Sequence, residues 1–331
     1  MNRRQYLART SAAGVSTGTL AAMAGCLGEL TGSSDTDNVA VSDRTGERAI
    51  ARAAGSLNEA AQSLNDLDDL EDPEAVEFDP TVPRDSLSAA REHLETAESE
   101  LGDDRTSDIE TLRSYADALA GLIAVTVAVT DDTITDDIEA VNAALAENGN
   151  LEAANETVDE RNETVTGARE RHAESTTTID SIDGDRLGEL SGIDLAELED
   201  GAAALGDAVT SLETLTETYD ATLSEDDGFG ALERGRNKLE NGEYEVAQAA
   251  FETAEATFSA SVDRLETGRS ESPEGYADYF ETASCQNGHL RDAAAAFAEA
   301  AAAAADRDPV AAENHRNQGE DSLDAVGSCT D

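Results

Sequence analysis

The chain has 331 residues, with 73 acidic against 22 basic residues, and its formal net charge is −51. Nucleic acid is excluded as a partner, because the charge repels phosphate over the whole surface and the sequence has no basic stripe. Anionic lipid headgroups are disfavoured for the same reason, so any membrane attachment has to come from something other than charge.

The N-terminus has the layout of an export signal. Arg3 and Arg4 precede a weakly apolar stretch of Ala, Gly, Ser and Thr over residues 12–25, and Cys26 follows directly. A charged start, a short apolar stretch and small residues before a cleavage point are typical of signal peptides. The stretch is too short and too polar to span a bilayer.

The pair Arg3-Arg4 resembles the twin-arginine export motif, and Met23-Ala24-Gly25-Cys26 resembles a lipobox, in which the cysteine receives a lipid after cleavage. The resemblance implies that residues 1–25 are removed and that Cys26 becomes the lipidated first residue. It also implies a location on the extracellular face of the membrane, with the lipid as the only membrane anchor. Three positions depart from the usual residues of these motifs: Asn2, Tyr6 and Met23.

The charge balance resembles that of proteins from extreme halophiles, since Lys238 is the only lysine. At a salt concentration of 1 M the Debye length falls to about 3 Å, so that self-repulsion of a folded acidic protein becomes tolerable. The resemblance as a whole is therefore to twin-arginine-exported lipoproteins of the halophilic-archaeal type.

After the signal, residues 26–45 are rich in Ser, Thr, Asp and Gly without apolar periodicity, which predicts a flexible tether. From Ile50 onward, apolar residues recur at helical spacing and strict alternation does not persist. We therefore predict an all-α fold of antiparallel helical hairpins, with a helical bundle over residues 46–225. The stretch Ala116–Val129 is apolar on nearly all sides but shorter than a membrane span, which indicates a buried central helix.

A repeat over residues 226–331 indicates paired helices. Asn241-Gly242 is followed by Ala247, Phe251 and Ala254, and Asn287-Gly288, 46 residues later, is followed by Ala293, Phe297 and Ala300. A fainter copy begins at Asn148-Gly149. Asn-Gly pairs favour a left-handed turn between antiparallel helices.

This spacing resembles the second half of a tetratricopeptide (TPR) repeat, which implies a surface that binds peptides or proteins. The period of about 46 residues departs from the usual length of about 34. A simple bundle with three similar hairpin turns is an equally good interpretation.

The sequence contains no nucleophile, phosphate-loop or dinucleotide motif, so we predict that the protein is not an enzyme. Cys285, His289 and Asp292 are close in sequence, but we expect Gly288 to break the helix that would align them. We therefore predict no metal site and no cofactor.

Two kinds of covalent modification are predicted in the exported domain. After Cys26 is lipidated, Cys285 and Cys329 are the only cysteines left, and disulfides persist outside the cell. Two helices of about nineteen residues, over about 288–306 and 309–327, would return Cys329 to the level of Cys285, which predicts a disulfide. The sequons at Asn155 and Asn162 are seven residues apart, and this spacing places both N-glycosylation candidates on one helix face.

Taken together, these patterns predict a non-enzymatic surface lipoprotein that binds another protein at the cell surface or organises the envelope. The alternative is a ligand-capturing component of an uptake system, which would require a cleft with convergent polar groups.

We predict that the fold is stabilised by salt, because about fifty uncompensated negative charges repel one another when the chain is compact. Circular dichroism should show loss of helix on dialysis into dilute buffer and recovery in molar sodium chloride. Sucrose, which does not screen charge, serves as the control and should restore less helix. A melting temperature that does not change with ionic strength would contradict this prediction.

Overall fold

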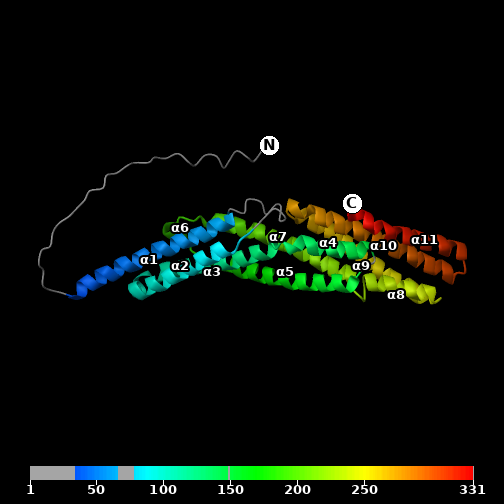
Figure 1. Ribbon diagram of the computed structural model, residues 1–331, viewed down its shortest axis with the longest axis horizontal. Coiled ribbons are helices and arrows are strands. Elements are labelled where there is room, and N and C mark those ends of the chain that lie inside the picture. Colours follow the sequence, from blue (N-terminus) through cyan, green and yellow to red (C-terminus); the bar gives the residue numbers. More distant parts are fainter. Residues whose placement is uncertain (1–33, 66–77, 148–149, 331) are drawn as a thin grey trace, which may run out of the picture. The chain divides into compact units, whose positions relative to one another are not determined.

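A computed structural model describes residues 34–65, 78–147 and 150–330. Within these ranges the regular structure is helical and no strand occurs, which confirms the predicted all-α class (Figure 1). From Val41 onward, the described residues form one compact unit. The export signal, residues 1–25, and the lipidation residue Cys26 lie outside the described residues.

Long α-helices make up most of the compact unit. The first half contains α1 (Ser34–Asn65), α2 (Thr81–Leu101), α3 (Thr106–Val129), α4 (Thr133–Glu147), α5 (Leu151–Asp180) and α6 (Gly184–Ser191). The second half contains α7 (Leu195–Leu223), α8 (Phe229–Glu240), α9 (Tyr244–Glu271), α10 (Ala277–Ala305) and α11 (Pro309–Ala325). Short 3₁₀ turns are η3 (Gly102–Arg105), η4 (Glu274–Tyr276) and η5 (Val326–Thr330).

Helix α1 begins at Ser34, so that it includes residues 34–45 of the predicted flexible tether over residues 26–45. The helix is anchored further along the chain, where Ala49 and Ile50 are buried. Extending an existing helix into a polar stretch adds one hydrogen bond for each residue fixed and needs no new nucleus. The predicted tether is therefore too long at its C-terminal end.

Two hydrophobic clusters form the core. One joins α1, α2, α3 and α6, and the other joins α3, α4 and α5 to all the helices from α7 onward. Leu215 of α7 belongs to the same cluster as Phe251 of α9, so the predicted regions 46–225 and 226–331 share a core.

Helix α3 contributes to both clusters and is the buried central helix predicted from its composition. By length and composition the stretch Thr106–Ala146 could cross a membrane. However, 56% of its most apolar window is buried inside the protein, and α3 packs against α2, α5 and α7. Such burial is the ordinary property of a core helix.

Three phenylalanines each pack on a glycine of a neighbouring helix. Phe251 of α9 lies on Gly235 of α8, where an added Cβ would come within 2.5 Å of the ring. Phe297 of α10 lies on Gly319 of α11, where the corresponding distance is 2.8 Å. Phe280 of α10 packs in the same way on Gly268 of α9. The absence of a Cβ at these glycines allows the helices to approach closely.

The turn predicted at Asn241-Gly242 is confirmed. Gly242 has φ 75°, and its N–H donates to the carbonyl of Leu239 at 3.1 Å, while Glu243 donates to Lys238 at 3.0 Å. These bonds end α8 and start the return of the chain in α9. The weaker copy at Asn148-Gly149 lies outside the described residues, between α4 and α5.

The turn predicted at Asn287-Gly288 is wrong, because α10 runs without a break through both residues. The side chain of Asn287 is fully buried and donates to the carbonyl of Ala283 at 2.9 Å. It also accepts a hydrogen bond from the hydroxyl of Thr222 in α7 at 2.7 Å. Asn287 therefore satisfies its polar atoms inside the helix, and Gly288 is an ordinary helical residue.

A matched pair of glycine substitutions tests this packing. Gly319→Ala should lower the free energy of unfolding by about 1–3 kcal/mol, because the new methyl group would displace the ring of Phe297. Gly288→Ala should raise it by about 0.5–1 kcal/mol, because no atom outside its own helix lies within 4 Å of the added methyl and alanine favours helix.

Both values come from denaturant unfolding in molar salt. A destabilising Gly288→Ala would contradict the continuous α10, since only a turn with positive φ would penalise alanine there.

Candidate functional site

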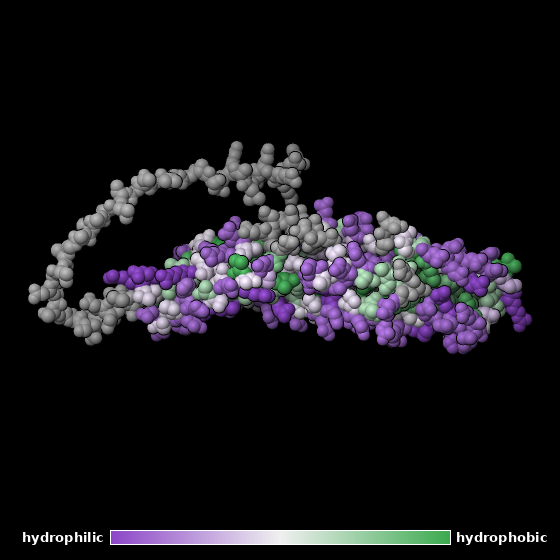
Figure 2. Space-filling view, in the orientation of Figure 1, coloured by the Kyte–Doolittle hydropathy of each residue, from purple (hydrophilic) through white to green (hydrophobic). Residues whose placement is uncertain are grey.

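A groove of about 720 Å³ lies where the α8–α9 turn meets the α10–α11 turn. Its volume is in the range of ligand and peptide clefts. The face seen in Figure 2 is mostly hydrophilic, with a hydrophobic patch over the region of α10 and α11. The groove is lined by Leu239, Tyr244, Ala300, Ala304, Arg307, Pro309, Ala312, Glu313 and Arg316.

Arg307 has a backbone conformation that is unusual for its residue type. Its φ is 63°, and it is the only non-glycine residue with positive φ in the part of the chain that the structure describes. Its N–H donates to the carbonyl of Ala304 at 3.1 Å, and the N–H of Asp308 donates to Ala303 at 2.9 Å. The same pair of hydrogen bonds ends α8, where glycine occupies the left-handed position.

The left-handed conformation costs a residue with a Cβ about 1–2 kcal/mol of conformational energy. Glycine has no Cβ and does not have this cost. Gly192 and Gly242 hold this position at the ends of α6 and α8. At the end of α10 the chain instead has Arg307, which lines the groove. Residues with a strained backbone are concentrated at functional sites. The strained backbone of Arg307 therefore indicates a functional role for this groove.

The electrostatics of the groove also differ from those of the chain as a whole. Among the described residues, Arg307 forms no ion pair and no side-chain hydrogen bond. The Arg316 guanidinium lies 3.9 Å from the Glu320 carboxylate, and both side chains are about half exposed, so this pair contributes little. Glu313 is the single acidic residue of the lining. Two guanidiniums therefore remain available to an anionic group in a protein with 73 acidic residues.

Two further grooves lack this property. The groove between α2 and α3 has a volume of about 390 Å³, and its Arg84 and Arg91 lie beside Glu92 and Glu95. Arg91 also pairs with Asp117 at 2.9 Å. A third groove of about 560 Å³ has three acidic residues in its lining and a single arginine, Arg264. A single deep pocket would have favoured ligand capture, whereas the described part of the chain has these three surface grooves of about 390–720 Å³.

The two sequons lie on α5, as their spacing predicts. Asn155 and Asn162 are both half-buried, and the Asn155 amide is 3.4 Å from the Asp159 carboxylate. Asn155 lines the third groove and not the groove that contains Arg307. Glycosylation at both sites stays a prediction.

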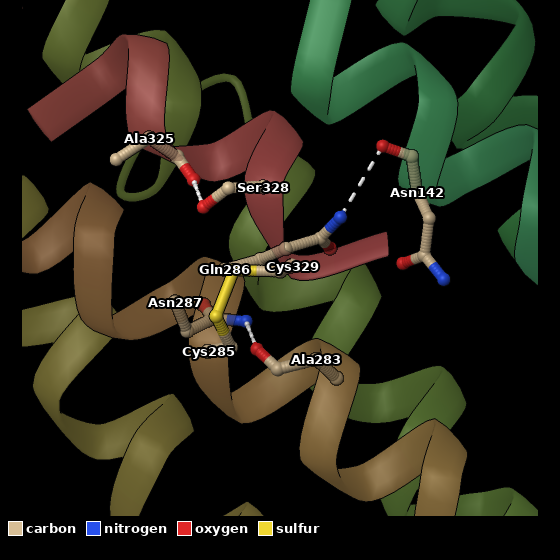
Figure 3. The surroundings of a disulfide bond; sticks show 8 residues. All are labelled: Asn142, Ala283, Cys285, Gln286, Asn287, Ala325, Ser328 and Cys329. Atoms are coloured by element: carbon tan, nitrogen blue, oxygen red, sulfur yellow. Dashed lines mark hydrogen bonds between the residues drawn. A yellow bond between two sulfur atoms is a disulfide. The ribbon is translucent and has the colours of Figure 1, made fainter. Parts of the chain in front are cut away.

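The Cys285–Cys329 disulfide is confirmed, with a Cα–Cα distance of 5.8 Å that falls inside the usual range. The route to it differs from the prediction, because Cys285 lies within α10 and not at a helix end. The hairpin of α10 and α11 returns the chain to the starting level, and Cys329 arrives in η5. In Figure 3 the bond lies beside Gln286, whose amide donates to the carbonyl of Asn142 in α4 at 3.3 Å.

The reason for expecting no metal site near His289 is also wrong. Gly288 does not interrupt α10, so Cys285 and His289 lie one turn apart on the same helix face. The ligand atoms of Cys285, His289 and Cys329 all lie within 4.8 Å of one another. Both cysteines are in the disulfide, which leaves no thiolate in this state of the protein.

Sequence reasoning did not single out the groove or its arginines. The available indication was the helix end at Asp306, where Arg307 and not glycine precedes the next helix. No protein-family model, no curated protein and no solved structure matches the chain. The fold and the groove define an all-α helical-hairpin protein with an arginine-lined surface cleft, and its function has to be argued from that cleft.

Proposed function

We propose that this protein is a non-enzymatic, lipid-anchored surface protein, whose groove at the α10–α11 turn binds a carboxylate-bearing segment of another surface protein. The strained Arg307 is the single observation that carries the binding proposal. The N-terminal sequence supports the location, since the paired arginines, the short apolar stretch and Cys26 occur in the order of an exported lipoprotein.

The groove favours a peptide partner over nucleic acid or lipid. Its alanine-rich floor, with Leu239 and Pro309, offers apolar contact to side chains, and Tyr244 adds an aromatic ring. Arg307 and Arg316 offer charged donors that pair well with carboxylates. A polyanion such as nucleic acid would be repelled by the net charge of −51. A short segment with one or two acidic side chains avoids most of that repulsion.

Anchoring depends in this proposal on Cys26 alone. Cys26→Ser should release the protein from the membrane fraction, because the proposed lipid on Cys26 is the attachment that the substitution removes. Replacing both Arg3 and Arg4 by Lys should instead leave the uncleaved precursor in the cytoplasm. Cell fractionation and intact mass distinguish the two outcomes. Normal membrane retention of the Cys26→Ser protein would overturn the anchoring part of the proposal.

Binding at the groove depends on Arg307, and Arg307→Gly separates this role from folding. The substitution relieves the left-handed strain, so the free energy of unfolding should rise by about 1 kcal/mol. It also removes a guanidinium, so affinity for a fluorescent peptide of alternating glutamate and leucine should fall about tenfold or more. Fluorescence anisotropy measures the affinity, and denaturant unfolding measures the stability.

The control variant replaces Arg84 and Arg91 by Ala in the groove between α2 and α3, and it should leave peptide affinity unchanged. A peptide with glutamine in place of glutamate should bind the wild type more weakly. Equal affinities of the wild type and Arg307→Gly for the glutamate peptide would overturn the binding proposal.

A further inference from the structure

Three metal-ligating side chains converge where α11 returns to α10. Cys285 and His289 are one turn apart on α10, and η5 places Cys329 against them. Their ligand atoms all lie within 4.8 Å of one another, and His289 and Cys329 are half-buried. Among the described residues, the His289 ring has no hydrogen-bond or ion-pair partner. The disulfide thus has a free imidazole beside it (the sulfurs are shown in Figure 3).

The dimensions of this cluster suit a tetrahedral metal ion. Zinc binds sulfur at about 2.3 Å and imidazole nitrogen at about 2.0–2.1 Å, which places neighbouring ligand atoms about 3.5–4 Å apart. The two sulfur atoms are now bonded to each other in the disulfide. After the bond is broken, rotation of the two cysteine side chains can separate the sulfur atoms while the 5.8 Å separation of the Cα atoms is kept.

We propose that reduction of the Cys285–Cys329 disulfide creates a zinc site, formed by the two thiolates and His289. Three protein ligands leave the fourth tetrahedral position open to water or another ligand. The disulfide and the metal ion are then alternative cross-links between α10 and the C-terminal turn. Redox state decides which of them is present. This inference is independent of the groove and of the anchoring proposal.

The chemistry balances with a dithiol as reductant. The disulfide gains two electrons and two protons, and the dithiol that supplies them becomes a cyclic disulfide. Zn²⁺ then displaces the proton of each thiol into solvent and binds the neutral imidazole of His289. An oxidising disulfide reverses the sequence: it accepts two electrons from the thiolates and two protons from solvent, the Cys285–Cys329 bond re-forms, and the metal ion is released.

Competition from the acidic surface does not remove the selectivity of such a site. Carboxylates prefer hard cations such as Mg²⁺ and Ca²⁺, whereas two thiolates with one imidazole prefer zinc and other softer ions. Cobalt(II) is therefore a suitable probe, because a cobalt–thiolate bond produces a charge-transfer absorption band that carboxylate binding does not. The many acidic groups contribute equally in the oxidised and the reduced protein.

The test uses the full chain with Cys26→Ser, so that Cys285 and Cys329 are its only cysteines. The protein is reduced with a dithiol, freed of reductant without oxygen, and titrated with Co²⁺ and then Zn²⁺ in molar salt. We expect a charge-transfer band that saturates at one Co²⁺ per chain in the reduced protein and is absent from the oxidised protein. Zn²⁺ should displace the cobalt and raise the melting temperature of the reduced chain.

His289→Gln should weaken zinc binding about tenfold or more, as expected for loss of one of three protein ligands. His93→Gln on α2 is the matched control and should leave the affinity unchanged. The proposal is overturned if the reduced protein shows no thiolate–cobalt band, or if His289→Gln binds zinc as tightly as His93→Gln. It is equally overturned if zinc does not raise the melting temperature of a folded reduced chain, or does not restore helix to a reduced chain that is unfolded.

Discussion

The close approach of α10 and α11, made possible where the ring of Phe297 lies on Gly319, is the contact on which the rest of the C-terminal structure depends. Two helices packed at this distance and joined by a short turn place their far ends together. The turn end carries Arg307 and the groove, and the open end brings Cys329 to Cys285. One small residue in the middle of the hairpin thus determines the geometry at both ends.

The same packing connects this hairpin to its neighbours. Phe251, which lies on Gly235 of α8, also stacks on Phe297 with ring centroids 5.4 Å apart. The two hairpins α8–α9 and α10–α11 are therefore joined through a pair of aromatic rings, each resting on glycine. Their turns come together at the groove as a consequence. A chain with only six phenylalanines uses two of them for this contact.

Because basic residues are few, the partners of each arginine indicate whether it has a structural role. Asp108 is almost fully buried in α3, and Arg105 lies 2.7 Å from one of its carboxylate oxygens. The Nε of Arg186 in α6 donates to the other oxygen at 2.6 Å. Removal of both arginines would leave the buried Asp108 carboxylate unpaired, which is strongly destabilising. Arg307 has no such structural partner among the described residues, and its backbone is strained.

The α10–α11 hairpin carries two chemically different groups of side chains, one at each end. Its turn end offers cationic groups over an apolar floor, and its open end offers sulfur and imidazole. Both sets are placed by helices and not by long loops, which holds side chains at defined distances. The buried face of α10 between them consists of alanines, Leu290 and Phe297, so that neither site depends on polar groups from the other.

Much of the fold follows from the sequence alone. Helical periodicity indicated the all-α class, and Gly242 indicated the turn after α8, because a glycine at a helix end allows positive φ. The length of the two returning helices was enough to pair Cys285 with Cys329. These features depend on local spacing, and local spacing is visible in a sequence.

The conformation at Asn287-Gly288 and the formation of the groove depend on tertiary contacts and not on local sequence preference. Asn287-Gly288 has the residues of a turn, but Thr222 of α7 satisfies the Asn287 side chain and keeps it inside α10. Because α10 is continuous, His289 lies beside Cys285 and not beyond a break. The groove likewise depends on two turns 65 positions apart in sequence, at Gly242 and Arg307, that meet only after the hairpins pack. The physical reason is the same in each case. A buried polar partner or a neighbouring helix that is remote in sequence determines the local conformation or surroundings, and the local residues alone would favour others.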